Sequence, residues 1–448
     1  MFIDLHIHST ESDGTDSPEA IVEKILNEAG IKIFALTDHD TVSGIEKIEK
    51  VLPSDIFFIN GVEFSCKISD GDKCHILAYF YDSSNEKFQE ILQKGNELRR
   101  KQFDIRLKYL SEKYGITFSE SDIAEMCKAT IVGKPHIVNF VSTKFGLNKN
   151  TLYKDLQKCY VGDARQDAAT VIKAIKEAGG VAVWAHPLGG EGEPLLSDTE
   201  FETRLNKLVN IGIQGLECYY SLYTDEQEDF LAKNAQKNNL LISGGSDYHG
   251  TNKNIQLCEL GREYSSRFAD SSKIIWRLTI LQKIFEKHKN PRIRKAFEIA
   301  KKAHDGQVDK AGIDYIYHPM TVAFQCVGDD STIIVALLHD VVEDTNYIWD
   351  DLQKQIPLNA EELEALKLLT HDKSVPYTDY IENIKTSDLA RKVKMCDLHH
   401  NMDYSRFFKD VKQWGNSQKF TEAIESLPEN IITSLSKYGD AYYQLSMK

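Results

Sequence analysis

From residue 1 to about 262, short apolar runs alternate with stretches of helical periodicity. The runs have the length of single strands, as at 33–37, 181–185 and 240–243. Strands that alternate with helices in this way predict a parallel sheet or a barrel. The expected fold class of this part is therefore α/β.

Polar residues follow shortly after these apolar runs. Asp38 and His39 follow the first run, His186 the second, and Asp247 and His249 lie beyond the third. The carboxyl ends of parallel barrel strands meet at one mouth, where functional groups gather. The pattern therefore predicts one shared site.

The pattern changes twice further along the chain. Residues from about 84 to 178 are helical and rich in charge, which indicates an insertion placed to cover the barrel mouth. Residues 266–290 suit one linking helix, and Pro291 suits the first turn of the next. Helical periodicity with few glycines then predicts an all-α domain. We expect a first domain at 1–265, a linker at 266–290 and a second domain at 291–448.

The composition is typical of a soluble protein. Of the 448 residues, 42% are hydrophobic, and no apolar run is long enough to span a bilayer. The first residues do not resemble a secretory signal, so we expect a cytoplasmic protein without a membrane partner. Eight cysteines without a Cys-x-x-Cys pair indicate reduced thiols. The net charge of −14 disfavours long nucleic acids as partners. We take a homodimer as a working hypothesis.

Histidines and carboxylates recur at the predicted strand ends. His6 and His8 are two positions apart on a predicted strand, so they point to the same side. Such a pair is more often incidental than metal-binding, but further candidates follow it. They are Asp13, His39, Glu63, His75, His186, Asp247 and His249. Imidazoles suit zinc, iron or manganese, and we expect Asp13 and Glu63 to be catalytic by bridging ions that share a hydroxide able to attack phosphorus.

The order and spacing of these motifs resemble the polymerase and histidinol phosphatase (PHP) family over residues 1–262. The motifs are 4–9 (DLHIHS), 36–40 (LTDHD), 61–63 (GVE), 185–187 (AHP) and 246–249 (SDYH). The resemblance implies a distorted seven-stranded βα barrel and a centre of up to three divalent ions, Mn, Zn or Fe. The implied ligands are His6, His8, Asp13, His39, Glu63, His75, His186, Asp247 and His249.

The insertion, together with Asp13, is similar to the branch of the family that cleaves nucleoside monophosphates or 3',5'-bisphosphates. We expect Lys134, His136 and Arg99 to neutralise a substrate phosphate, since cations match its oxygens. Arg99 precedes a second arginine that points elsewhere on a helix, so a structural role is open for both. The alternative activities are a histidinol-phosphate-type phosphatase and an exonuclease on short oligonucleotides.

A second set of ionisable residues lies at 336–345 (ALLHDVVEDT), within an otherwise apolar helical pattern. Burying these groups is costly unless a metal or charge partner compensates. His339 and Glu343 are four residues apart, as are Asp340 and Asp344, which predicts that they stack along one helix side. A surface acidic helix is the alternative, and the flanking valines and leucines disfavour it.

Residues from about 290 to 420 resemble the HD-type hydrolase domain of bacterial alarmone enzymes. The motifs are 303–307 (AHDGQ), 315–319 (YIYHP), 337–345 (LLHDVVEDT) and 395–401 (MCDLHHN). The resemblance implies one ion, usually manganese, held by His318, His339, Asp340 and Asp397. It also implies that Glu343 and Asp344 activate water and that Lys310 and Asn401 contact the substrate.

Two positions depart from that pattern, because Asp309 and Leu398 stand where the family usually has arginine. Losing such a cation weakens binding of a highly anionic ligand by roughly 1–3 kcal/mol. We therefore expect removal of a phosphate or pyrophosphate group from a nucleotide, with guanosine tetraphosphate as one candidate. A nucleotide sensor without turnover is the alternative. Ordinary packing or surface roles are expected for His288, His371, His399 and His400.

Overall fold

The computed structural model describes residues 2–27, 31–53, 56–69, 71–128, 130–161, 164–190, 194–258, 277–326, 329–403 and 428–447. The chain divides into two compact units, unit 1 (Met1–Ser272 with Leu278–Ile280) and unit 2 (Lys273–Arg277 with Leu281–Lys448). Of the predicted linker at 266–290, residues up to 276 lie outside the described part. The remainder includes a 3-10 turn, Thr279–Leu281, and the short helix α10, Gln282–Glu286.

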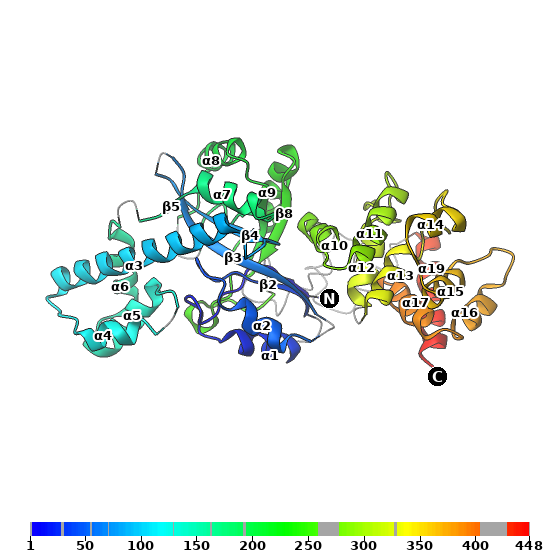
Figure 1. Ribbon diagram of the computed structural model, residues 1–448, viewed down its shortest axis with the longest axis horizontal. Coiled ribbons are helices and arrows are strands. Elements are labelled where there is room, and N and C mark those ends of the chain that lie inside the picture. The colour runs from blue at the N-terminus through cyan, green and yellow to red at the C-terminus, as the bar shows by residue number, and fades with distance from the viewer. Residues whose placement is uncertain are drawn as a thin grey trace. The chain divides into compact units, whose positions relative to one another are not determined.

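Unit 1 is built on a nearly closed sheet of strands (Figure 1). In spatial order they are β1 (Phe2–Asp4), β2 (Ile31–Leu36), β3 (Phe57–Lys67), β4 (Lys73–Tyr79), β6 (Val181–Trp184), β7 (Gly215–Tyr220) and β8 (Leu241–Gly245). Only β4 runs antiparallel to its neighbours along this path. The backbone N–H of Leu5 donates to the carbonyl of Gly244, and Ile7 bridges Tyr248, so the first and last strands meet. The predicted distorted seven-stranded barrel is confirmed.

Amphipathic helices pack against this sheet. They are α1 (Pro18–Asn27), α2 (Ile45–Val51), α7 (Ala168–Glu177), α8 (Asp198–Asn210) and α9 (Asp225–Lys237). In α7 the apolar residues Val171, Ile172 and Ile175 are buried, and the side chain of Asp167 caps the helix by accepting from the N–H of Thr170. Strands β6 and β7 are buried at every position. This explains why parallel strands appear in the sequence as continuous apolar runs.

Four helices lie between β4 and the two-residue strand β5 (Gln166–Asp167). They are α3 (Glu86–Tyr114), α4 (Glu120–Met126), α5 (Lys134–Phe145) and α6 (Lys149–Lys158). Phe103, Leu110, Val138 and Leu152 form part of a separate apolar core among them. Figure 1 shows the long α3 reaching from these helices to α7 and β5, which it contacts. The helices occupy the predicted insertion at 84–178, except that α7 belongs to the barrel.

Unit 2 is helical throughout its described part, apart from one isolated bridge between Val308 and Asp314. Its main helices are α11 (Pro291–Ala303), α12 (Tyr317–Gln325), α13 (Asp330–Leu338), α14 (Trp349–Gln355), α15 (Ala360–Leu369), α16 (Tyr377–Ile384), α17 (Asp388–Asn401) and α19 (Glu429–Ser446). Helix α13 is buried from residue 332 to 338 and packs against α11, α12, α15 and α17. The predicted all-α fold is confirmed. None of the described helices is both long and apolar enough to cross a bilayer.

Candidate metal centres

His6 and His8 lie just beyond β1, which ends at Asp4. The extended backbone continues past that point, because the N–H of His8 donates to the carbonyl of Tyr248 at 2.9 Å. Both imidazoles are fully buried, and their Nε2 atoms are 3.1 Å apart. The two side chains therefore share one face, as predicted from their spacing.

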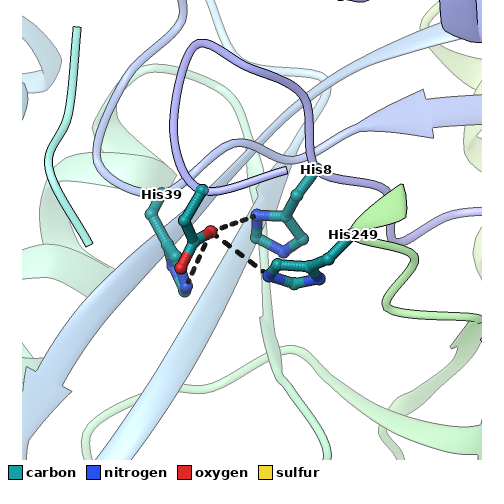
Figure 2. A group of neighbouring side chains, drawn as sticks. His8, His39 and His249 are labelled. Carbon is teal, nitrogen blue, oxygen red and sulfur yellow. Dashed lines mark ion pairs between the residues drawn. The ribbon is translucent and has the colours of Figure 1, made fainter. Parts of the chain in front are cut away.

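Asp13 lies at the centre of a group of three imidazoles. Its Oδ1 is 3.2 Å from Nε2 of His249, 3.9 Å from Nδ1 of His8 and 3.9 Å from Nε2 of His39 (Figure 2). Figure 2 shows the three rings converging from separate segments of the barrel mouth. Ligand atoms of the four residues all lie within 4.8 Å of one another.

Glu63 links this group to the other candidate ligands of unit 1, and we call the whole set of nine side chains the metal cluster. Its Oε2 lies 3.1 Å from His8 Nε2, 3.1 Å from His39 Nδ1 and 3.3 Å from His6 Nε2. Its Oε1 lies 2.8 Å from His75 Nδ1 and 3.1 Å from His186 Nε2. Such a carboxylate is placed to bridge ions.

Asp247 completes the set of residues implied by the resemblance. Its Oδ1 lies 3.5 Å from His6 Nε2 and 3.4 Å from His8 Nε2. Asp247 has a φ of 60°, and His186 and Asp40 also have positive φ values, of 29° and 52°. Backbone strain of this kind concentrates at functional sites, where the surrounding structure holds it in place.

The donor set fits divalent cations. Asp13 Oδ1 is buried and faces three ring nitrogens, yet it has no hydrogen bond within the described part of the chain. Burial and the neighbouring His249 lower the pKa of His8 to about 4, and burial also lowers the pKa of His75 and His39. These rings are therefore neutral, which is the form that binds metals.

Glu217 lies behind two histidines of the metal cluster and was not predicted from the sequence. It lies in β7, is fully buried, and accepts from the backbone N–H of His186 at 2.6 Å. Its other oxygen lies 2.9 Å from Nδ1 of His6. The available signal was a single acid inside an apolar strand, 215–220 (GLECYY).

Two further buried carboxylates hold the loops that carry ligands. Asp38 accepts from the hydroxyls of Ser9 and Ser12 at 2.6 Å each. Asp4 accepts from the hydroxyl of Ser246 at 2.5 Å. Burial raises the pKa of both carboxyls to about 6, against the lowering effect of these hydrogen bonds. Asp4 and Asp38 therefore fix the ligand loops without facing the cluster.

Residues of the insertion reach the cluster from α5. A Cβ atom at Gly133 would lie 2.8 Å from Asp13 Oδ2, so the start of α5 packs directly on that ligand. Lys134 is the first residue of the helix, and Nδ1 of His136 accepts from the N–H of Gly133 at 3.0 Å. The start of α5, which carries both of these predicted phosphate contacts, therefore lies next to Asp13.

Arg99, the third predicted phosphate contact, is engaged elsewhere. Its Nε donates to Asp40 Oδ2 at 2.7 Å and its Nη2 donates to the hydroxyl of Ser65 at 2.6 Å. The side chain is nearly buried. The geometry favours the structural alternative, in which Arg99 ties α3 to the segment that follows His39.

In unit 2, four predicted ligands converge from three helical regions. His318 Nε2 lies 3.3 Å from Asp340 Oδ2 and 3.2 Å from Asp397 Oδ1. His339 Nε2 lies 3.1 Å from Asp340 Oδ2 and 3.8 Å from Asp397 Oδ1. His339 Nε2 is buried without a hydrogen bond in the described part of unit 2, which fits a cation between these groups.

The predicted continuous helix at 336–345 was wrong. Helix α13 ends at Leu338, His339 to Glu343 follow in turns, and Asp344 lies in a bend. This segment leaves the carboxylates of Glu343 and Asp344 at an exposed edge, where their charge costs less than it would in a buried helix such as α13. Tyr315 donates from its hydroxyl to Asp340 at 2.8 Å and to Asp344 at 3.1 Å.

A surrounding layer of residues orients these ligands. Nδ1 of His400 lies 2.6 Å from Nδ1 of His318, although only a packing role was expected for His400. Lys394 contacts Asp397 at 2.8 Å, and Asn401, a predicted substrate contact, donates to Asp397. Lys310, the other predicted contact, donates to Ser434 at 3.2 Å.

Comparison with known proteins agrees with this geometry. A model of the PHP domain matches residues 4–135. A 5'-3' exoribonuclease of Haemophilus influenzae is 30% identical over 255 residues, covering 55% of this chain and 89% of the relative. The chain belongs to the PHP family. A solved structure described as a metal-dependent phosphoesterase of Bifidobacterium adolescentis aligns with a TM-score of 0.51 at 26% identity, over 61% of this chain and 96% of the other.

The PHP unit is joined to an HD domain, whose model matches residues 296–374. The bifunctional (p)ppGpp synthase/hydrolase SpoT of Escherichia coli is 33% identical over 128 residues, covering 25% of this PHP protein and 18% of SpoT. Together the two domains identify a hydrolase of phosphoester bonds that uses divalent metal ions.

Proposed function

We propose that the PHP unit hydrolyses the phosphomonoester of a nucleotide, either a nucleoside monophosphate or a 3',5'-bisphosphate. The observation that carries this proposal is the cluster of nine side chains that includes Glu63 and Asp13, with α5 of the insertion packed against it. The start of α5 adds Lys134 and His136, which suit a phosphate dianion. Phosphate binding and hydrolysis would thus occur at one place.

The cluster would hold up to three ions of Mn, Zn or Fe. Three groups of donors suit them: His8, Asp13, His39 and His249; His6, His8 and Asp247; and His39, Glu63 and His75, with His186 beside Glu63. Bound divalent ions acidify water and stabilise the charge that develops on phosphate. Glu217 holds His6 and His186 in place, and Asp38 fixes the loop that leads to Asp13.

For unit 2 we propose hydrolysis of a phosphate or pyrophosphate group on a nucleotide, with guanosine tetraphosphate as one candidate. His318, His339, Asp340 and Asp397 would hold one ion, expected to be manganese. Glu343 and Asp344 would accept a proton from the attacking water; their position at the exposed edge beside Asp340 supports this role. The likeness to SpoT supports this proposal.

A second candidate activity for unit 1 is 5'-3' exonuclease action on short RNA. The Haemophilus influenzae relative is named a 5'-3' exoribonuclease, and its match covers 55% of this chain and 89% of the relative. A mononucleotide phosphatase releases phosphate from AMP, whereas an exonuclease releases mononucleotides from an oligonucleotide. The two activities are therefore separated by their products.

The test is a product assay on the full chain with manganese. AMP, 3',5'-bisphosphates, guanosine tetraphosphate and short RNA are offered to wild type, His8→Ala and Asp340→Ala. We expect His8→Ala to lose the hydrolysis of phosphomonoesters. We expect Asp340→Ala to lose instead the release of phosphate or pyrophosphate by unit 2. If His8→Ala alone abolishes all turnover, unit 2 is a sensor and the two-enzyme proposal fails.

The two reactions would act in series if they share a nucleotide. We propose that the domains at 1–265 and 291–448 act in series. One domain would remove a 3'-phosphate or 3'-pyrophosphate group from a nucleotide, and the other would hydrolyse the product of that reaction. Comparing product formation by the two single variants, separately and mixed, tests the series. No common intermediate between them would contradict it.

A further inference from the structure

A cleft of about 850 Å³ opens between the barrel loop that carries Asp13 and the insertion helices α4 and α5. Its lining includes Thr10 and Gly14 from the loop, Met126 from α4, and His136, Phe140 and Thr143 from α5. Small-molecule clefts span roughly 300–1,000 Å³ and combine apolar walls with a few polar groups. The cleft has the size and the composition of a ligand site.

One wall of this cleft lies next to Asp13 of the metal cluster. Gly14 directly follows Asp13, and the backbone of Gly133 packs on the Asp13 carboxylate. His136, which lines the cleft, is bonded to the same glycine. A phosphate bound at the cluster would therefore leave the rest of its molecule lying in the cleft.

Hydrogen bonds fix the insertion to the barrel at this cleft. Thr130 donates its hydroxyl to Glu11 Oε2 at 2.8 Å, and the N–H of Ile131 donates to the Glu11 carbonyl at 3.1 Å. On the other side, Asn139 donates to Asn252 at 3.3 Å. Because its walls are already held in place, this cleft loses little conformational entropy when a small ligand binds, which favours affinity.

The charges of the lining do not form a cationic groove. Glu11 is paired with Lys47 at 2.5 Å, and Asp122 is paired with Lys144. The exposed residues Glu125 and Lys128 add one charge of each sign. Proteins that follow the backbone of an oligonucleotide use a positively charged groove. This lining instead suits the uncharged part of one nucleotide.

Phe140 supplies an aromatic surface in the cleft. It lies on α5, one helical turn after His136, and Nζ of Lys144 is 5.7 Å from its ring centroid. Any nucleobase can stack on an aromatic ring, because every base has a flat π-face. His136 lies on the side of the cleft near the metal cluster, where a phosphate would bind. Phe140 lies one helical turn further along α5, where a base would bind.

We propose that this cleft binds the base and ribose of a single nucleotide, with the base stacked on Phe140 while its phosphate lies at the metal cluster. The inference rests on the proposed function of unit 1 and narrows its substrates to mononucleotides. Oligonucleotides would need a cationic path that this cleft lacks.

The test compares AMP with ribose 5-phosphate, which carries the phosphate but no base. The measured quantity is the ratio of kcat/KM for AMP to kcat/KM for ribose 5-phosphate, on the full chain with manganese. Phe140→Leu keeps apolar volume but removes the aromatic face, so the ratio should fall by about tenfold or more. Phe140→Tyr keeps the face and should keep most of the ratio.

Phe118→Leu is the matched control, because Phe118 packs on the same insertion core but does not line the cleft. Its ratio should equal that of wild type. An unchanged ratio in Phe140→Leu overturns the inference, as does a wild-type kcat/KM that is higher for a dinucleotide than for AMP. If wild type releases phosphate from neither AMP nor ribose 5-phosphate, the proposed function of unit 1 fails first.

Discussion

Glu217 Oε1 lies 2.9 Å from Nδ1 of His6, and both side chains are fully buried. A carboxylate at Nδ1 holds the proton there and leaves Nε2 available to a metal. Nε2 of His6 faces Glu63 and His8, as a ligand of the cluster requires. Glu217 therefore orients a ligand from behind.

Replacing Glu217 with glutamine should lower the manganese affinity of unit 1 by about 10–100-fold. An amide accepts through one atom only, so either His6 or the backbone N–H of His186 would face an NH2 group. Calorimetric titration with manganese measures the loss. Glu202→Gln, on the exposed side of α8, is the control and should bind as wild type does. Equal affinities in the two variants would contradict this role.

The first site was largely predictable because its residues follow strands. A βα barrel brings strand ends to one mouth, so His39, His186 and Asp247 could be expected together. Glu217 was not predicted because it is a single acid within an apolar strand. No other candidate ligand lies near it in the sequence, so no motif spacing marks it. Its role depends on which strands become neighbours, and that is set by tertiary packing.

The second site shows a different limit of sequence patterns. The periodicity at 336–345 fits a helix, yet the helix ends at Leu338. In the segment that follows, His339 stays buried, whereas Glu343 and Asp344 reach an exposed edge, where their charge costs less. His400 and His399 are adjacent in the sequence, and only the packing of α17 against α12 decides that His400 meets His318. A lone histidine carries no such information.

Metal should stabilise the two units separately. Manganese at 100 times its dissociation constant stabilises the unit that binds it by about 2.7 kcal/mol, and a chelator removes that gain. His8→Ala should abolish the gain in unit 1, and Asp340→Ala should abolish it in unit 2. Differential scanning calorimetry with and without manganese measures both, and each variant is the control for the other. Loss of both gains in one variant would argue against independent sites.

His400 should matter for metal binding in unit 2, whereas its neighbour should not. His400→Ala removes the ring 2.6 Å from Nδ1 of His318, so manganese affinity should fall by about 10–100-fold. His399 is exposed, and His399→Ala should leave the affinity unchanged. Electron paramagnetic resonance of free manganese during a titration gives the dissociation constant of each variant. Similar losses in the two variants would point to a general defect of α17.

Glu11 should make unit 1 sensitive to acid. Burial alone would raise the pKa of Glu11, but hydrogen bonds from Lys47, Ser43 and Thr130 hold it below its usual range. A carboxyl with a lowered folded pKa stabilises the protein above its unfolded pKa, near 4.5, and loses that contribution as the pH falls through the folded value. Urea unfolding of wild type and Glu11→Gln should thus differ at pH 7 and converge towards low pH. A difference independent of pH would contradict this.

Arg99 offers a test between substrate binding and structure. Arg99→Met leaves the carboxylate of Asp40 buried without its 2.7 Å partner, so the free energy of unfolding should fall by about 3–5 kcal/mol. Adding Asp40→Asn should recover part of that loss, since asparagine tolerates the positive φ of 52° at this position. Urea denaturation of the two single variants and the double variant measures the coupling. The exposed Arg100 is the control, and Arg100→Met should change stability by no more than about 0.5 kcal/mol. A rise in KM for AMP without loss of stability in Arg99→Met would instead place this arginine on the substrate.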